Sequence, residues 1–171
     1  RALGLGGDIT QAVITYLATT SRLVRMRHGA MPVHLLLLGA PSAGKSYTLQ
    51  IVLKLLPPDA YHIIDAGSPR VLIYDTSDLR HRVLVFGEAD SLPAGEDNPA
   101  ASAVRNLVQD HCLHYKVTVK DEESGGFTVR DIRKDGPTVL ITTATRSLGE
   151  QLTSRLFVLE AEESTKQIQD A

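Results

Sequence analysis

Cysteine, long apolar runs and an excess of positive charge are all missing from this sequence, and each absence excludes a class of protein. A single cysteine, Cys112, permits no internal disulfide, which fits a protein of the reducing cytoplasm. No apolar run approaches the roughly 20 residues that cross a bilayer, so we expect no membrane partner. The 18 lysines and arginines are outnumbered by 20 aspartates and glutamates, so no overall basic field attracts nucleic acid. Any contact with DNA must therefore come from a local patch.

An initial methionine and a signal peptide are also missing. The sequence begins at Arg1 and ends in a polar stretch at Ala171, so we expect it to be a cytoplasmic piece of a longer protein. Its 171 residues, 43% of them apolar, suit one soluble domain with a sizeable core.

The most informative segment is an octapeptide with the pattern G-x-x-x-x-G-K-[ST], which is typical of a phosphate-binding loop. Its residues are Gly39, Ala40, Pro41, Ser42, Ala43, Gly44, Lys45 and Ser46. The apolar run 35–38 leads into the loop, and residues 47–56 have the pattern of a helix. Because the motif needs a strand before it and a helix after it, this context favours a nucleotide site over an ordinary glycine-rich turn.

The chemistry of phosphate binding explains why these residue types occur here. Gly39 and Gly44 allow backbone conformations that direct successive N–H groups at phosphate oxygens. The start of the helix, which includes Tyr47, adds its partial positive charge. Lys45 reaches the β- and γ-phosphates, and the hydroxyl group of Ser46 ligates Mg²⁺. The sequence therefore predicts ATP and Mg²⁺ as cofactors.

Hydrophobic periodicity predicts that strands and helices alternate along the chain. We expect strands at 33–38, 61–64, 82–88, 139–143 and 156–159, helices at 9–27, 45–56, 70–74, 99–112 and 148–154, and a turn and a loop at 65–69 and 91–99. This alternation implies a three-layer α/β sandwich with a five-stranded parallel sheet. Two alternating stretches within 114–132, joined by an acidic turn, predict a β-hairpin inserted into that plan.

A basic cluster lies at the end of the first predicted helix. Arg22, Arg25 and Arg27 suit the C-terminal end of a helix, where cations interact favourably with its dipole. The alternative is a contact with nucleic acid or with a nucleotide base, and the sequence leaves both interpretations open.

Hydrolysis requires a second site, in which another strand presents an acid to the metal or to the attacking water. The apolar run 83–86, followed by Gly87 and Glu88, is the best candidate. The usual ending is aspartate followed by glutamate, but here Gly87 takes the first place. Glu88 must therefore activate water, hold the metal shell, or do both, and Asp90 could assist. The alternative is that these acids cap a following helix.

The order of these parts resembles that of the AAA+ ATPases over nearly the whole chain. The loop has the form G-x-P-x-x-G-K-S, with the proline that is common in that superfamily. The segment 139–146 is similar to the AAA+ fourth strand, which ends in a polar residue called sensor 1. The resemblance places this role on Thr145, or on Thr143 if the alignment shifts. The usual residue is asparagine, but threonine can also hydrogen-bond a water or a γ-phosphate oxygen.

The segment 152–157 is similar to the one that carries the arginine finger of the family. This arginine reaches into the nucleotide site of a neighbouring subunit and is worth about 10³–10⁵ in rate. The resemblance assigns the finger to Arg155, and an ordinary surface arginine is the alternative. It implies a ring-type homo-oligomer, a hexamer in the full-length protein. Residues 1–30 would form an N-terminal helical segment and residues 31–171 the ATPase core, without the family's lid domain.

The predicted hairpin lies just before the fourth strand, where a clade of AAA+ proteins that includes the MCM-type helicases carries its pre-sensor-1 hairpin. In those rings the hairpins face the pore and track DNA. The resemblance gives this task to Lys116 and Lys120, which share one face of an alternating strand. The other basic residues of the segment are Arg130, Arg133 and Lys134. The acidic turn would repel DNA at the tip, so a solvated charged edge that discourages aggregation is the alternative.

More narrowly, the sequence resembles helicase-type ATPase modules of bacterial phages and mobile elements, which are often attached to primase or zinc-finger modules. We therefore expect an ATP-hydrolysing motor domain of a DNA helicase that serves replication. Because Gly87 replaces the usual aspartate, a nucleotide-dependent assembly switch with little turnover is the first alternative. A P-loop kinase of small molecules is the second, and it would have a mobile lid but no arginine finger.

Overall fold

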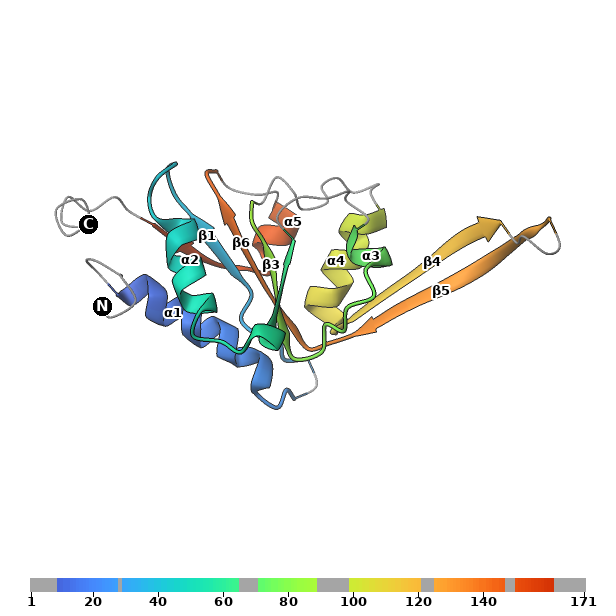
Figure 1. Ribbon diagram of the computed structural model, residues 1–171, viewed down its shortest axis with the longest axis horizontal. Coiled ribbons are helices and arrows are strands. Elements are labelled where there is room, and N and C mark those ends of the chain that lie inside the picture. Colours follow the sequence, from blue (N-terminus) through green and yellow to red (C-terminus); the bar gives the residue numbers. More distant parts are fainter. Residues whose placement is uncertain are drawn as a thin grey trace.

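The computed structural model describes residues 9–27, 29–64, 71–88, 99–120, 125–146 and 150–161. A five-stranded parallel sheet forms its centre, helices cover both faces, and a two-stranded antiparallel arm projects to one side (Figure 1). The predicted turn at 65–69 and the predicted loop at 91–99, apart from Pro99, lie outside the described residues. None of the described helices is long and apolar enough to pass through a bilayer.

The central sheet contains the strands β1 (Leu35–Leu38), β2 (Tyr61–Ile64), β3 (Arg82–Phe86), β6 (Thr138–Ala144) and β7 (Phe157–Glu160). Their order is β2-β3-β6-β1-β7, and every neighbouring pair is parallel. β6 lies between β1 and β3, with Thr142 in register with Leu36 on one side and with Phe86 on the other. Because all strands run the same way, the segments that follow β1, β3 and β6 gather at one edge of the sheet.

Helices cover both faces because successive strand residues enter two different cores. The helices are α1 (Thr10–Thr20), α2 (Lys45–Leu53), α3 (Val71–Tyr74), α4 (Pro99–Asp110) and α5 (Glu150–Thr153). Leu35 and Leu37 pack in the core with α1 and α2, whereas Leu36 packs in the core with α3 and α4. Strands that are buried on both faces have continuous apolar sequences, which explains why periodicity and composition located them.

The first helix ends earlier than predicted. α1 stops at Thr20, a 3₁₀ turn follows over Ser21–Leu23, and the chain is extended at Val24. The hydroxyl groups of Thr19, Thr20 and Ser21 donate to carbonyl oxygens three residues earlier. Such local bonds compete with a continuing α-helix. The predicted helix over 9–27 is therefore wrong in its last turns.

The three arginines at this point have different environments. Arg22 is buried, and its Nη1 donates to the carbonyl oxygen of Thr19 at 2.7 Å, at the C-terminal end of α1. The helix-end interpretation is therefore right for Arg22. Arg25 and Arg27 are exposed and lie beyond both α1 and the 3₁₀ turn, so the helix-end interpretation is wrong for them.

The predicted hairpin is present and is longer than expected. β4 (Cys112–Lys120) and β5 (Phe127–Asp135) pair antiparallel, from Cys112 opposite Asp135 to Lys120 opposite Phe127. They form a sheet of their own that extends away from the body of the domain (Figure 1). Leu113 at the root is fully buried, whereas Phe127 near the tip is 80% exposed. The arm is therefore anchored at one end and surrounded by solvent at the other.

Candidate nucleotide site

The phosphate-binding loop begins where β1 ends, between two other strand ends. The N–H of Gly39 donates to the carbonyl oxygen of Ala144 at 3.1 Å, and the N–H of Ala161 donates to that of Leu38 at 2.6 Å. A Cβ atom at Gly39 would lie 2.5 Å from the carbonyl oxygen of Ala161. Gly39 is thus required for close packing against the end of β7, rather than for the unusual backbone conformation that the sequence predicted.

The curvature of the loop comes from two left-handed residues. Ser42 has φ of 69° and Gly44 has φ of 76°. Only Gly44 adopts this conformation without a steric cost, because it has no Cβ atom. A left-handed residue next to right-handed ones directs neighbouring N–H groups to one side, which makes a concave site for an anion. The conformational role predicted for glycine in this loop therefore falls on Gly44.

Lys45 lies over the start of the loop. Its side chain is buried, and Nζ donates to the carbonyl oxygens of Gly39 at 2.8 Å and Ala40 at 2.6 Å. A lysine ammonium group has three N–H donors and no acceptor. These bonds hold a positive charge beside the concave side of the loop, where a phosphate chain would lie.

The first turn of α2 completes the loop. Ser46 and Tyr47 are both exposed there. The residue before the helix, Gly44, supplies no side-chain cap, so no capping side chain competes for the first N–H groups of α2. A left-handed glycine, a buried lysine and an uncapped helix start with an exposed serine fit a phosphate chain with Mg²⁺.

Glu88 lies at the same edge of the sheet. β3 ends at Phe86, the N–H of Gly87 still donates to the carbonyl oxygen of Ile64 at 3.3 Å, and Glu88 follows as an exposed residue. Because β6 separates β3 from β1, two strand spacings, or about 10 Å, separate Glu88 from the loop. Asp90, the other acid that the sequence proposed, lies outside the described residues.

The two threonines considered for sensor 1 differ sharply. Thr143 is 3% exposed, and its Oγ1 donates to the carbonyl oxygen of Gly87 at 2.6 Å. Thr145 is exposed and lies just past the end of β6, between the strand ends that carry the loop and Glu88. Thr145 is thus the one that can face a ligand at this edge. The bond from Thr143 to Gly87 was not foreseen, since no pattern links residues on different strands.

Arg155 lies at the opposite edge of the sheet. It lies two residues before β7, whose first residue, Phe157, donates its N–H to the carbonyl oxygen of His34 just before β1. The Nε of Arg155 donates to Oε1 of Gln109 on α4 at 3.0 Å. These residues border an open cleft of about 730 Å³, lined by Gly29, Met31, Gln109, Asp110, His111, Ser154 and Arg155. The structure therefore does not bring Arg155 together with the phosphate loop.

The two hairpin lysines share one exposed face of β4, as predicted. Asp131 is directly opposite Lys116, and this aspartate also contacts Nε2 of His114 at 2.7 Å. Phe127 is directly opposite Lys120. The face therefore combines positive charge with carboxylates and an exposed aromatic ring, and is not uniformly basic.

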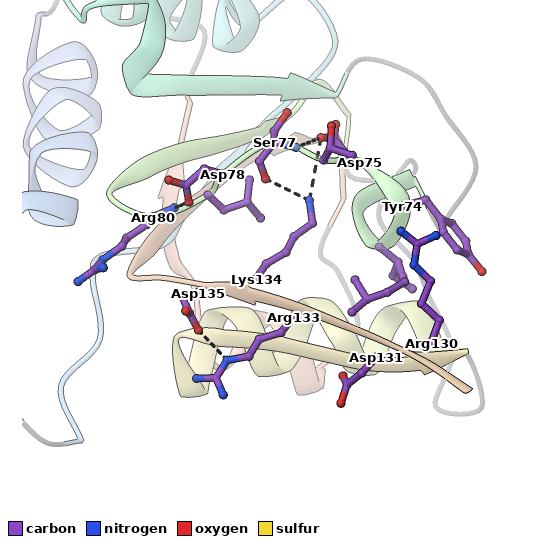
Figure 2. A pocket seen from close by; sticks show the side chains of 14 residues that line it. Tyr74, Asp75, Ser77, Asp78, Arg80, Arg130, Asp131, Arg133, Lys134 and Asp135 are labelled. Carbon is purple, nitrogen blue, oxygen red and sulfur yellow. Dashed lines mark hydrogen bonds and ion pairs between the residues drawn. The ribbon is translucent and has the colours of Figure 1, made fainter. Parts of the chain in front are cut away.

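At the root of the arm, Lys134 is buried and belongs to a polar cluster that sequence reasoning missed (Figure 2). Its Nζ donates to the carbonyl oxygen of Ser77 at 3.2 Å and lies 4.0 Å from Oδ1 of Asp75. The other carboxylate oxygen of Asp75, Oδ2, contacts Nε2 of His62 at 2.9 Å. Burial lowers the pKa of Lys134. Burial alone would raise the pKa of Asp75, but hydrogen bonds from Ser77 and the charges of His62 and Lys134 lower it overall. Lys134 therefore anchors the arm and is not available to DNA.

Comparison with known proteins supports the same fold. Residues 6–171 match the family described as the MTBMA_p00010 P-loop domain. The chain belongs to this P-loop family. Among curated proteins, no match to this P-loop domain is found. Among solved structures, it is similar to a proline-to-glycine mutant of RuvB from Thermotoga maritima, with a TM-score of 0.57 and 20% sequence identity.

The match covers 92% of this chain and 47% of the RuvB chain, so the P-loop domain spans about half the length of that protein. At this level of identity the likeness concerns the fold alone. Together with the sheet order, it confirms the predicted fold class, a three-layer α/β P-loop domain with a five-stranded parallel sheet.

Proposed function

We propose that this P-loop domain binds and hydrolyses ATP with Mg²⁺, as the motor domain of a DNA helicase or translocase that serves replication of a phage or mobile element. The observation that carries the proposal is the placement of the phosphate loop and Glu88 at one edge of the sheet, with only β6 between them. A separation of about 10 Å leaves room for a phosphate chain between the lysine and the acid.

The residues at this edge have distinct tasks in the proposal. Lys45 and the loop N–H groups bind the β- and γ-phosphates, and Ser46 ligates the metal ion. Glu88 polarises the attacking water and contributes to the metal shell, while Thr145 senses the γ-phosphate. When bound, Mg²⁺ would neutralise part of the negative charge on the phosphates.

Arg155 is proposed to act on the nucleotide of a neighbouring subunit. The length of β1, four residues or about 13 Å, separates the edge that carries Arg155 from the edge that carries the loop. A role within its own site is therefore not supported by this geometry. The domain would work in a ring-type homo-oligomer, a hexamer in the full-length protein.

The hairpin supports the DNA part of the proposal. Its length, its projection from the body and the exposed face with Lys116 and Lys120 suit contact with a phosphate backbone outside the domain. An attached primase or zinc-finger module is part of the same proposal and rests on the resemblance of the sequence.

The test of the nucleotide site compares two lysines in the full-length protein, one at the start of α2 and one just after its end. Lys45→Ala should abolish binding of a fluorescent ATP analogue, whereas Lys54→Ala, an exposed lysine just after α2, should bind like wild type. Glu88→Gln should keep the affinity within about twofold and lose hydrolysis, since it retains the shape of the side chain but not its charge. Unchanged melting temperatures show that the variants fold. Binding by Lys45→Ala within about threefold of wild type would contradict the assignment.

A nucleotide-dependent assembly switch is the second candidate, because Gly87 stands where an aspartate would help to hold the metal ion. Turnover of ATP by the full-length protein, measured with and without DNA, separates the two. Turnover that DNA stimulates supports the motor, while nucleotide-dependent assembly without turnover supports the switch. Appearance of a phosphorylated acceptor in place of free phosphate would instead indicate a kinase.

A further inference from the structure

Little in the sequence restricts the backbone just before Glu88, the acid proposed to polarise water. Gly87 has no side chain, so its backbone is freer to rotate than that of the aspartate usual at this place. β3 ends at Phe86, so neither Gly87 nor Glu88 belongs to the strand. An acid that polarises water must be held in a defined place, because a displacement of about 1 Å can cost about 10²-fold in rate. Some contact from outside β3 must therefore hold this segment.

The structure provides such contacts from both neighbouring strands. On the side of β2, the N–H of Gly87 donates to the carbonyl oxygen of Ile64 at 3.3 Å. On the side of β6, Oγ1 of Thr143 donates to the carbonyl oxygen of Gly87 at 2.6 Å. Backbone pairing between β3 and β6 ends at Phe86 and its partner Thr142, but β6 continues for two more residues. The side chain of Thr143 therefore makes the next hydrogen bond between the two segments.

The bond from Thr143 bears directly on Glu88. The carbonyl group of Gly87 and the N–H of Glu88 belong to one planar peptide unit. A hydrogen bond to that carbonyl oxygen therefore restricts the rotation of the plane from which the Glu88 side chain departs. Because Thr143 is 3% exposed, its hydroxyl group has little competition from water.

We propose that Thr143 is a positioning residue for hydrolysis, which orients Glu88 by binding the carbonyl oxygen of Gly87. The inference rests on the proposed function, because it presumes that Glu88 polarises water. It gives Thr143 a role distinct from that of Thr145, which is exposed at the end of the same strand. Thr143 does not touch the nucleotide in this proposal and acts only through the peptide that precedes the acid.

The experiment replaces Thr143 and compares it with a threonine of the same strand. Thr143→Val keeps the volume and removes the hydroxyl group, and Thr143→Ser restores the hydroxyl group. Thr138→Val is the matched control, since Oγ1 of Thr138 also donates to a buried carbonyl oxygen, that of Leu79 at 2.8 Å, at the opposite end of β6. For each protein, kcat and KM for ATP and the affinity for a fluorescent ATP analogue are measured. The NMR order parameter of the Glu88 N–H is measured alongside.

We expect Thr143→Val to lower kcat by about 10- to 100-fold and to leave KM and nucleotide affinity within about twofold. The order parameter of Glu88 should fall from about 0.85 toward about 0.6. Thr143→Ser should restore kcat and the Glu88 order parameter, and Thr138→Val should change neither of these two quantities.

Several results would overturn the inference: an unchanged kcat or an unchanged Glu88 order parameter in Thr143→Val, or an equal loss of kcat in Thr138→Val. A different result would reject the proposed function alone. If wild type binds ATP but never hydrolyses it, while Thr143→Val still loosens Glu88, the positioning bond stands and the hydrolytic role of Glu88 does not.

Discussion

Arg155 donates a hydrogen bond from Nε to Oε1 of Gln109 at 3.0 Å and lies at the edge of the sheet opposite the phosphate loop. Because the guanidinium group is rigid and planar, this hydrogen bond donated by Nε restricts the orientation of the whole group. The contact with α4 therefore orients the guanidinium group of Arg155 that a neighbouring subunit would meet.

Mixing experiments test whether Arg155 acts between subunits. Arg155→Ala and Lys45→Ala should each inactivate the full-length assembly. A mixture should recover part of the activity, because some interfaces then pair an intact loop with an intact arginine. ATP turnover is measured over a range of mixing ratios, with each variant alone as the control. No recovery in mixtures that demonstrably co-assemble would show that Arg155 acts within its own chain or not at all.

Charge reversal on the arm tests the DNA contact. Lys116→Glu combined with Lys120→Glu should weaken DNA binding and leave the DNA-free ATPase rate intact, and each lost phosphate contact should lower the salt slope of binding by about one. Because Asp131 lies opposite Lys116, the neutral pair Lys116→Gln and Lys120→Gln separates lost attraction from added repulsion within the hairpin. Arg130→Glu, on the other face of the arm, is the control. Unchanged affinity and salt slope would move the search for DNA contacts to Arg25 and Arg27.

His34 should make the domain sensitive to acid. It is 1% exposed, its Nδ1 accepts the N–H of Leu140 at 3.0 Å, and its Nε2 lies 3.1 Å from the carbonyl oxygen of Val108. A neutral ring satisfies both contacts, and burial lowers the pKa of His34 from 6.5 to about 4. The lowered pKa means that the unfolded chain binds the proton first. Stability is therefore fully present above pH 6.5 and is lost as pH falls toward 4.

The expected loss of unfolding free energy over this window is about 3 kcal/mol, from about 1.4 kcal/mol per pH unit. Urea unfolding at several pH values measures it. In His34→Asn the titrating group is gone, so the stability difference from wild type should shrink as the pH falls. A wild-type stability that is flat between pH 6.5 and 4.5 would contradict the assignment.

Thr142→Val should stabilise the domain. Thr142 is fully buried, and its Oγ1 has no hydrogen-bond partner in the part of the chain that the structure describes. Replacing the hydroxyl group by a methyl group removes the cost of burying it unpaired, and the free energy of unfolding should rise by about 1 kcal/mol. The same change at Thr138 breaks a hydrogen bond and should lower it by a similar amount. Denaturant unfolding of both variants measures these changes in the free energy of unfolding. A destabilised Thr142→Val would indicate that Oγ1 of Thr142 has a hydrogen-bond partner outside the described residues.

Patterns among residues close together in the sequence were enough to predict the phosphate loop, the central strands and the hairpin. The loop motif is eight consecutive residues, and a strand buried on both faces is a continuous apolar run, as at 35–38. The end of α1 was mistaken because the hydroxyl groups of Thr19 and Ser21 bond locally, which periodicity of apolar residues does not reveal.

The contacts between residues far apart in the chain were decided by the tertiary structure. Thr143 and Gly87 are 56 residues apart, Arg155 and Gln109 are 46 apart, and His34 and Leu140 are 106 apart. No short period connects such pairs. They meet because the helices on both faces determine which strands become neighbours, and because parallel register then determines which residues lie at the same edge. The sequence alone specified the chemical groups available to the site, and the order and register of the strands decided which of them face one another.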